Sequence, residues 1–509
     1  MASQHGLTPL QRKSLSRRAF LLKVGAPAAL MAVVAGCQTP AAAPTTAPAP
    51  AATQAPKPAA TTAPAPAATT APAATAAPAA AATTAPAAAT SPFLPPAVKA
   101  SAPMKITWWN WHGWHSDTIN KVAAEYKKLY DQNVTLETTA YPDQVQCKAA
   151  VTAAITGGSG PDLWSTLPGG DMVSVATSGT AISYTDELFT KDPDWEKSYF
   201  PFVRGLFSVN DKVWSATPIS NAYALWYNKG LFDKYSVKVP TTYDEFKAAS
   251  ATFLKNGVTP VSVAGGTASH PDMIFYWFVN SLGYANKMLQ ADLGQASWTD
   301  PQLVEAMQIY EDFGKANLVP AGVLGIKEPD AITLFASGKT AMMLEGNWAR
   351  TTLAKAIAPD VKLGFVVLPA AKAGAKQTAL ASVGISTTIN KASKNLEIAK
   401  SVARFVTTGA GRAIYCGGVG IPPSGPASSA EKDQMAKAVN DPVWPDCVDV
   451  GSKATGLRHL FTPTVEQALG QAAATILSGK GKAADVLAQV EAISKQAGKR
   501  NFTVPPWNM

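Results

Sequence analysis

Apolar and polar residues begin to recur at regular spacing only well inside the chain. An apolar-rich run over residues 105–109 alternates as a strand does, and the apolar positions of residues 117–130 have helical spacing. The same two patterns predict a strand at 133–139, a helix at 143–155 and a short strand at 163–165. Strand, helix, strand, helix, strand within about sixty residues indicates a parallel α/β sheet.

A second α/β set follows the first. Its predicted strands are residues 225–228, 259–263, 340–344, 362–368 and 381–389. Its predicted helices are residues 243–254, 270–282 and 301–317, and the chain is mostly helical from residue 395 onward. We find no internal repeat, and the length of the patterned part is that of two or three domains.

Polar and aromatic residues follow two strands of the first predicted sheet. Asn110, Trp111 and His112 come directly after the first strand, and Trp164 lies in the third. Ligands of open parallel α/β sheets bind beyond the carboxyl ends of the strands. These four side chains are therefore candidates for ligand contact. For a tryptophan, packing in the core is the alternative and the commoner role.

The first 37 residues have the composition of an export signal. Residues 1–18 are polar and basic, and residues 24–36 are uncharged but shorter than the about 20 residues of a membrane span. The segment Ser16–Leu21 is similar to a twin-arginine signal, and Sec export stays open. The uncharged run closes on Val34–Cys37, which resembles a bacterial lipobox with Cys37 as the lipidated residue. We expect an extracytoplasmic protein, lipid-anchored to the bacterial cell membrane; an ordinary signal peptide is the alternative.

Residues 38–102 form a linker of low complexity. From Gln38 to Thr90 every residue is Ala, Pro or Thr except Gln38, Gln54 and Lys57. Such a segment cannot bury a core, and its prolines favour extended polyproline II geometry at about 3.1 Å per residue. We expect a disordered spacer that lifts the following domain away from the membrane. Glycosylation of its threonines is left open.

The net charge of +9 is concentrated in the leader and linker. Seven of the 44 basic residues and none of the 35 acidic residues precede residue 103, which leaves +2 for the rest of the chain. The composition therefore gives no support to a nucleic-acid-binding surface.

Three cysteines follow Cys37, and an extracytoplasmic location permits a disulfide. Cys416 and Cys447 flank a Gly/Pro-rich stretch, which favours them as the pair and leaves Cys147 as a buried free thiol. The other pairings stay open, because spacing alone does not decide between them. The chain contains no CxxC spacing, which excludes a structural zinc site of that type.

Two histidines, His112 and His115, lie close to Asp117 in the sequence. A metal site there is conceivable, but there is no HExxH motif and the spacing matches no common helix-borne site. We therefore predict polar cleft residues or surface histidines, and no metal site.

Motifs of common enzyme classes are incomplete in this chain. Gly338-Lys339-Thr340 ends like a phosphate-binding loop, but Thr333 replaces the required first glycine and the lysine leads into a strand. No GxSxG elbow occurs, and the glycines at 417–420 lack a dinucleotide fingerprint. A carboxylate pair could still come together from distant positions, so a glycosidase is not excluded. We predict no cofactor.

Several short motifs follow one another between residues 103 and 509. They lie at residues 160–164, 218–232, 240–246, 335–348, 367–369, 384–386 and 477–479. Together they resemble the bacterial extracellular solute-binding proteins of the maltose-binding type (family 1). The segment Phe335–Trp348 is the most recognisable, and the resemblance spans residues 103–509.

This resemblance implies a two-lobed, periplasmic-binding-protein-like α/β fold of type II, with a ligand cleft between lobes joined by hinge crossovers. Lobe one would comprise residues 103–218 and 364–390, and lobe two residues 219–363 and 391–509. Ligand would shift the cleft toward a closed form that an ABC permease recognises. The implied partners are ABC permease subunits and a separate ATPase, with the binding protein itself a monomer.

The resemblance also points to ligand-binding residues beyond the first sheet, namely Asn221, Tyr223, His270, Asp272, Trp348 and Trp444. Trp348 matches a position that commonly stacks on sugar in this family. Sugars place C–H faces on aromatic rings, and their hydroxyls need paired donors and acceptors. The implied ligand is a carbohydrate, expected to be an oligosaccharide, and no residue is assigned a catalytic role.

Other functions remain open. The same scaffold could bind a peptide or a polyol phosphate, although few basic residues fall at the expected cleft positions. An exported glycoside-active enzyme would need two cleft carboxylates about 5–10 Å apart. The linker is the only feature of the sequence that favours a wall-associated adhesion protein.

Overall fold

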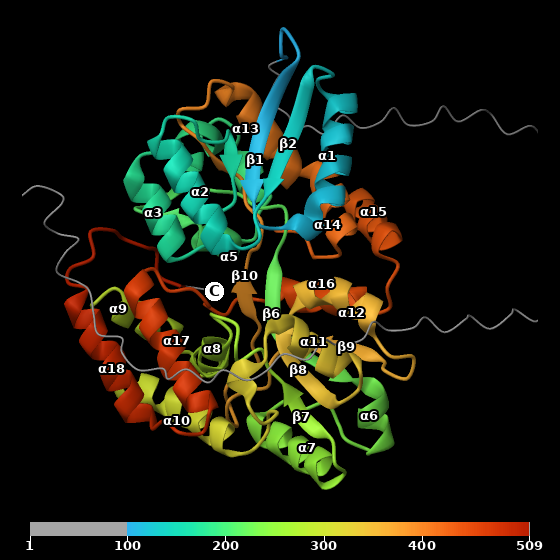
Figure 1. The fold of residues 1–509 in the computed structure, drawn as a ribbon, viewed down its shortest axis with the longest axis vertical. Helices are drawn as coiled ribbons and strands as arrows, with labels where there is room; N and C mark the ends of the chain where they lie inside the picture. Colours follow the sequence, from blue (N-terminus) through green and yellow to red (C-terminus); the bar gives the residue numbers. More distant parts are fainter. Residues whose placement is uncertain (1–98, 508–509) are drawn as a thin grey trace, which may run out of the picture. The chain divides into compact units, whose positions relative to one another are not determined.

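The computed structural model describes residues 99–507, all of which belong to one compact unit, Ala85–Met509. The predicted export signal, Cys37 and the linker up to residue 98 lie outside the described residues. Figure 1 shows two α/β lobes within this unit, each with its own sheet. The predicted fold class, a two-lobed α/β fold of type II, is confirmed.

The sheet of lobe one has the strand order β11-β3-β1-β2. Its strands are β1 (Met104–Asn110), β2 (Val134–Ala140), β3 (Leu163–Trp164) and β11 (Thr388–Ile389). β1 is parallel to both of its neighbours, and β11 joins β3 in the antiparallel sense. Because β1 and β3 run in the same direction, their carboxyl ends meet at one edge, as the sequence predicted.

Short helices and one hairpin complete the first part of lobe one. They are η1 (Gly113–His115), α1 (Ser116–Leu129), α2 (Gln144–Thr156), α3 (Gly170–Ser178), η2 (Thr185–Phe189), α4 (Pro193–Lys197), α5 (Pro201–Leu206), β4 (Ser208–Val209) and β5 (Lys212–Val213). Asp143 caps α2 by accepting a hydrogen bond from the backbone of Gln146, and Asp192 caps α4. Asp171 of α3 accepts a hydrogen bond from Gln144 of α2, which ties these two helices together.

The sheet of lobe two has the order β10-β6-β8-β7, with β9 also paired to β6. Its strands are β6 (Asn221–Asn228), β7 (Thr259–Ser262), β8 (Thr340–Gly346), β9 (Leu363–Val366) and β10 (Leu380–Ser382). Every residue of β8 is buried, as a continuous apolar run in a central strand requires. Glu345 is the one charged residue within this strand.

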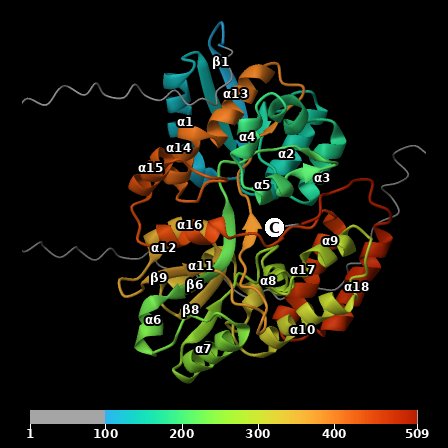
Figure 2. The same ribbon diagram turned by 180° about the vertical axis from the view of Figure 1, so that it is seen from behind.

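The helices between these strands cover the second sheet (Figures 1 and 2). They are α6 (Lys229–Lys234), α7 (Tyr243–Lys255), α8 (Pro271–Ser281), α9 (Ala285–Asp292), α10 (Pro301–Lys315), η3 (Val323–Gly325), α11 (Glu328–Ala336), η4 (Asn347–Ala349) and α12 (Arg350–Ala356). A capping box between Thr242 and Glu245 begins α7 at Tyr243, the predicted first residue of this helix.

The last six helices divide between the two lobes. They are α13 (Leu396–Thr407), α14 (Gly409–Val419), α15 (Ser429–Val439), α16 (Trp444–Ser452), α17 (Pro463–Leu477) and α18 (Ala483–Gln496). Phe405 of α13 packs on Tyr126 of α1, with ring centroids 5.4 Å apart, and Tyr415 of α14 bonds to His115. Figure 2 shows α13, α14 and α15 with lobe one, and α16, α17 and α18 with lobe two.

The predicted partition of the chain between lobes needs correction beyond residue 363. Residues 364–382 were expected in lobe one, but β9 and β10 both pair with β6 of lobe two. Residues 391–439 were expected in lobe two, but α13 and α14 cover α1 of lobe one and α15 packs on α14. The chain therefore passes to lobe one near residues 383–387, because β6 needs β10 as an edge partner, and returns after α15.

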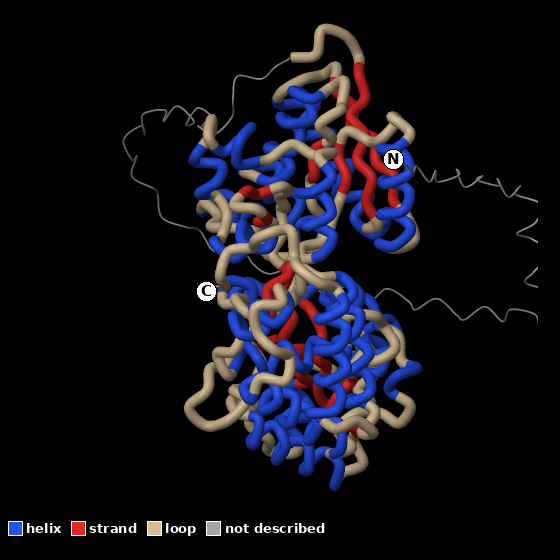
Figure 3. Tube along the Cα trace, turned by 90° about the vertical axis from the view of Figure 1, so that its left-hand side faces the viewer, coloured by secondary structure: helices blue, strands red, loops and turns tan. Residues whose placement is uncertain are grey.

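The crossovers lie side by side between the two sheets (Figure 3). The Thr217 hydroxyl donates to the carbonyl of Ile385 at 2.6 Å, which joins the first crossover to the second. The boundary predicted at residue 218 is consistent with this first crossover. Away from the crossovers, the lobes also touch where the backbone N–H of Gly170 in α3 donates to the carbonyl of Leu460 at 3.0 Å.

The three described cysteines are free and buried, so the predicted disulfide between Cys416 and Cys447 is wrong. Cys416 belongs to α14 on lobe one, where its thiol donates to the carbonyl of Pro218, whereas Cys447 belongs to α16 on lobe two. Cys147 is a buried free thiol, as predicted. Across residues 99–507 we find no helix with the length and apolar character to cross a membrane.

Candidate functional site

The carboxyl end of β1 places three predicted site residues at the edge of lobe one. The side chain of Asn110 is buried, and its Oδ1 accepts a hydrogen bond from the backbone of His112 at 2.8 Å, while its Nδ2 has no partner. The Nδ1 of His112 also has no partner, and burial lowers the pKa of this imidazole to about 3. His112 is therefore neutral, and its Nδ1 is available for a hydrogen bond to a ligand.

Aromatic rings flank this edge. The ring of Trp111 lies 4.7 Å from that of His112, and Trp111 and Trp164 both line a cavity of about 240 Å³ between α2 and α3. Trp164 is nearly buried, at 4% exposure, whereas Trp111 is partly exposed. Trp111 is thus the more accessible of the two rings.

His115 lies against His112 and is hydrogen-bonded to α14. Its Nδ1 is hydrogen-bonded to the Tyr415 hydroxyl, and burial, followed by the neighbouring His112, lowers its pKa well below the usual value. The two imidazole rings stack with centroids 4.7 Å apart. His115 therefore packs the end of β1 against α14 within lobe one.

The first crossover brings Asn221 to the same place as His112. A methyl group added at Gly384 of the second crossover would lie 3.1 Å from Asn221 Nδ2 and 3.4 Å from His112 Nε2. Asn221 is buried, and its Oδ1 lacks a partner. Lobe one and the first crossover thus contribute polar groups around one point, and Gly384 of the second crossover leaves room there.

Tyr223 lies next in β6 and faces the second lobe's charged residues. Its hydroxyl is buried without a partner, and burial, followed by the charge of Glu345, raises its pKa well above the usual value. The hydroxyl is therefore a neutral donor.

Helix α8 supplies the predicted residues His270 and Asp272. His270 precedes the helix as its N-cap, and Asp272 lies in the first turn. Tyr276 follows Asp272 by four residues and shares its face of the helix. Asp272 Oδ1 and the Tyr276 hydroxyl are both buried, and they lie close enough to interact with each other.

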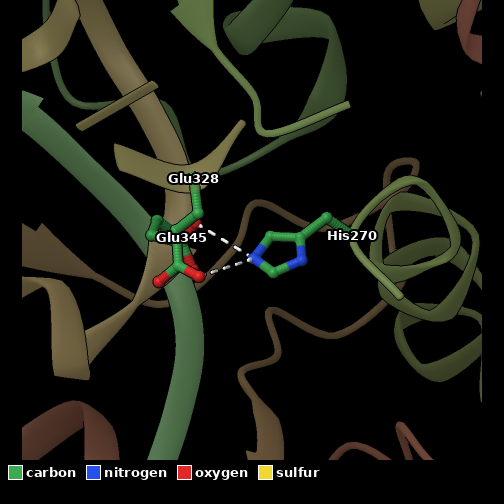
Figure 4. Close-up of side chains that lie close together, drawn as sticks. All are labelled: His270, Glu328 and Glu345. Carbon is green, nitrogen blue, oxygen red and sulfur yellow. Dashed lines mark ion pairs between the residues drawn. The ribbon is translucent and has the colours of Figure 1, made fainter. Parts of the chain in front are cut away.

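Two carboxylates from other elements converge on His270 (Figure 4). Its Nε2 lies 3.3 Å from Oε2 of Glu345 in β8 and 3.9 Å from Oε2 of Glu328, the first residue of α11. Burial disfavours the charged imidazole, but the negative charges of Glu345 and Glu328 outweigh it and raise the pKa of His270 to about 9. These three ligating atoms lie within 4.8 Å of one another.

Trp348 lies beside this cluster, directly after β8 and within the short helix η4. Its Nε1 donates to Glu328 Oε1 at 2.9 Å, and the guanidinium carbon of Arg458 lies 5.4 Å from its ring centroid. The ring is partly exposed. The hydrogen bond and the cation hold the indole in place and leave part of its surface accessible.

A groove of about 630 Å³ borders the start of α8. Asp272 and the loop at 265–269 line one side, and Glu466 and Gln467 of α17 line the other. Burial, followed by the charge of Asp272, raises the pKa of Glu466 to about 8, so this carboxyl group holds its proton at neutral pH. Burial also raises the pKa of Asp272, against the lowering effect of Arg458.

Trp444 is the first residue of α16 and belongs to the hydrophobic core, at 7% exposure. The predicted binding role of Trp444 stays a prediction, and its burial favours packing.

Sequence reasoning missed Glu328, Glu345, Tyr276 and Arg458. Glu345 carried a usable signal, because a lone carboxylate inside an apolar strand is costly unless it has a role. Arg458 lies in the connection between α16 and α17, where no local pattern marks it, and only tertiary packing brings it to Trp348.

Residues 112–413 match the family described as bacterial extracellular solute-binding protein. A Brucella abortus protein named as a binding protein is 29% identical over 200 residues, which cover 39% of this chain and 47% of that protein. The multiple sugar-binding protein of Streptococcus mutans is 26% identical, over 40% of this chain and 49% of its own. The melibiose/raffinose/stachyose-binding protein of Bacillus subtilis is 25% identical, over 51% and 59%. The chain spans about half the length of these relatives.

Solved structures share the fold at lower identity. A chitin oligosaccharide binding protein superposes with a TM-score of 0.65 at 18% identity, covering 78% of this chain and 99% of its own. A cyclic alpha-maltosyl-1,6-maltose binding protein from Arthrobacter globiformis gives 0.63 at 19% identity, with coverage of 78% and 99%. At these identities the likeness concerns the fold alone.

Proposed function

This chain belongs to the bacterial extracellular solute-binding proteins, and we propose that it captures a carbohydrate, an oligosaccharide, between its two lobes. The observation that carries the proposal is a set of buried polar atoms without partners around the crossovers. They come from both lobes: Asn110 Nδ2, His112 Nδ1, Asn221 Oδ1 and Tyr223 Oη. Buried polar atoms normally find partners, so this set is suited to a ligand rich in hydroxyl groups.

The partly exposed rings complete this chemistry. Trp348 and Trp111 offer apolar faces to the C–H side of a sugar ring, and the amide, imidazole and phenol groups offer donors and acceptors for its hydroxyls. Two of the relatives carry names that specify sugars, which supports the same ligand class.

The partners in this proposal are the permease subunits and separate ATPase of an ABC importer. A ligand held by both lobes favours the closed arrangement, and that arrangement would dock on the permease. We further propose that Cys37 carries a lipid anchor, which tethers the binding protein outside the cytoplasm. The tethered protein would work as a monomer. The motif ending at Cys37 supports the anchor.

Binding without catalysis is the proposed activity. Glu328 and Glu345 pair with His270, and Glu466, whose pKa is raised to about 8, holds its proton at neutral pH. A sugar should therefore leave the protein unchanged, and product analysis after incubation tests this. Cleavage would instead support the glycoside-active enzyme.

The first experiment measures the binding of mono- and oligosaccharides to the purified protein, with tryptophan fluorescence and melting temperature as the two readouts. At 100 times the dissociation constant a ligand adds about 2.7 kcal/mol of stability. Trp348→Ala should weaken sugar binding by about 10- to 100-fold, and Trp348→Phe by less, because Phe keeps an aromatic face. Equal affinity of wild type and Trp348→Ala would contradict the assigned stacking role, and a panel without binding would direct the search to non-sugar solutes.

A further inference from the structure

His270, Glu328 and Glu345 come from three separate elements and direct one ligating atom each toward a common point (Figure 4). We propose that this cluster is a binding site for a divalent transition-metal ion of the zinc type, held by His270 Nε2, Glu328 Oε2 and Glu345 Oε2. The proposal does not depend on the identity of the solute. It differs from the metal position considered in the sequence, which involved His112 and His115.

The spacing of these atoms suits a small ion. Zn²⁺ binds imidazole nitrogen and carboxylate oxygen at about 2.0–2.2 Å, which puts neighbouring ligands of a tetrahedral site on the order of 3.3–3.6 Å apart. The separations from Nε2 are 3.3 Å to Glu345 and 3.9 Å to Glu328, and all three atoms lie within 4.8 Å of one another. Glu328, whose side chain is 31% exposed, has room to move toward the other two ligands.

Each of the three side chains is oriented through its other polar atom. Glu328 Oε1 accepts from Trp348 Nε1 at 2.9 Å, and Glu345 Oε1 accepts from the backbone of Gly346 at 2.8 Å. His270 Nδ1 lies 3.2 Å from the carbonyl of Ala268, and a proton on that nitrogen leaves Nε2 free as a lone pair. Such outer contacts are what hold metal ligands in position.

The two innermost atoms are buried and face each other. The side chains of His270 and Glu345 are 8% and 1% exposed, and His270 Nε2 and Glu345 Oε2 form an ion pair at 3.3 Å with no further hydrogen-bond partner. A metal ion would take the place of the proton between them and ligate both atoms.

The surrounding charges favour a divalent cation. Asp272 and the two glutamates carry three potential negative charges near a single guanidinium, that of Arg458. Metal ligation displaces the proton that His270, with a pKa of about 9, holds at neutral pH. The neutral imidazole then leaves a net excess of two negative charges, which one divalent ion balances. Ca²⁺ would need six to eight oxygen ligands, more than this cluster offers, and a soft ion would prefer thiolates.

The test is metal uptake by the purified full chain after stripping with EDTA. Zn²⁺ is added alone, without sugar, and bound zinc is counted after dialysis. We expect one ion per chain and a raised melting temperature. Co²⁺ should give the visible absorption of a tetrahedral nitrogen/oxygen site, without the intense thiolate band that binding at a cysteine would produce.

Glu345→Gln and Glu328→Gln should each weaken Zn²⁺ binding at least 10-fold, and Glu328→Gln serves if the buried variant fails to fold. Glu466→Gln is the matched control, because it removes a nearby carboxyl group outside the cluster and should bind as the wild type does. No zinc in the stripped and reloaded chain, a thiolate spectrum, or unchanged binding in both glutamate variants would overturn the proposal. Sugar binding measured in EDTA separates this outcome from that of the proposed function.

Discussion

Gly170 lies where the two lobes touch, so a single methyl group added there meets the other lobe. It begins α3 in lobe one, and its N–H donates to Leu460 O of lobe two at 3.0 Å. A Cβ atom at Gly170 would lie 2.6 Å from Cγ and 3.0 Å from Cδ of Pro463. Gly170→Ala should therefore oppose the closed arrangement of the lobes while leaving each lobe folded.

The magnitude follows from these distances. Carbon atoms in contact are about 3.5–4.0 Å apart, so the methyl group overlaps Pro463 by roughly 1 Å. Overpacking of this kind costs about 1–3 kcal/mol, and the hydrogen bond to Leu460 adds about 1 kcal/mol when it is lost. A penalty of about 2–4 kcal/mol on the closed form alone lowers ligand affinity about 30- to 1000-fold, since each 1.4 kcal/mol is tenfold.

The assay is isothermal titration with the sugar that binds the wild type, together with the melting temperature of the free protein. Alanine favours helix over glycine by about 0.5–1 kcal/mol. In the ligand-free protein with its lobes apart, the variant should therefore melt at or above the melting temperature of the wild type. Small-angle scattering in the presence of ligand should show that the variant stays more open.

Gly470→Ala in α17 is the control, because a methyl group there meets no atom within 4 Å. It should leave the affinity unchanged. If Gly170→Ala bound the ligand as tightly as the wild type, the contact between Gly170 and Leu460 would not belong to the liganded form, and the reasoning would be refuted.

Three further predictions concern stability. The pKa of Glu466 is about 8 in the folded protein and about 4.5 in the unfolded chain, so the free energy of unfolding falls as the pH rises between these values. In denaturant titrations Glu466→Gln should have the wild-type free energy of unfolding near pH 4. Above pH 8 its free energy of unfolding should be a few kcal/mol higher than that of the wild type, on the order set by this shift. Arg350→Ala removes a nearly buried guanidinium that donates to Gly420 O at 3.0 Å and pairs with a carboxylate at 2.6 Å, and the free energy of unfolding should fall by about 3–5 kcal/mol; a drop below 1 kcal/mol would contradict this burial. Because Cys416 and Cys447 are free, dithiothreitol should leave the melting temperature unchanged. A clear decrease in the melting temperature would instead be evidence for a disulfide.

Local pattern was sufficient for much of the fold. The alternation at 105–109 and the helical spacing of 117–130 correspond to β1 and α1, and the strand predicted at 340–344 is the core of β8. These segments are predictable because each has one buried face or is buried throughout, which fixes its period. The division between lobes was not predictable, because the pairing of β9 and β10 with β6 depends on contacts between segments far apart in the sequence.

The candidate site divides in the same way. Asn110 and His112 follow a strand, and Trp348 lies in a recognisable motif, so all three could be named from the sequence. Glu328 and Arg458 are ordinary surface-like residues in their local context. They join the site only because α11 and the connection before α17 fold over the same end of β8, where Trp348 contacts both.

The edge strand β11 has a consequence for the order in which the protein can fold during synthesis. Ile389 pairs with Leu163, and α13 and α14 then cover helix α1, although the whole of the second sheet lies between these segments in the chain. A ribosome therefore releases every strand of lobe two before lobe one receives its last strand. The second sheet can therefore form first in the nascent chain, although the lobe-two helices α16, α17 and α18 emerge only later. Until residues 388–419 emerge, β3 presents an open edge to other chains. Translation pauses placed before or after this stretch should differ sharply in how much aggregated product they leave.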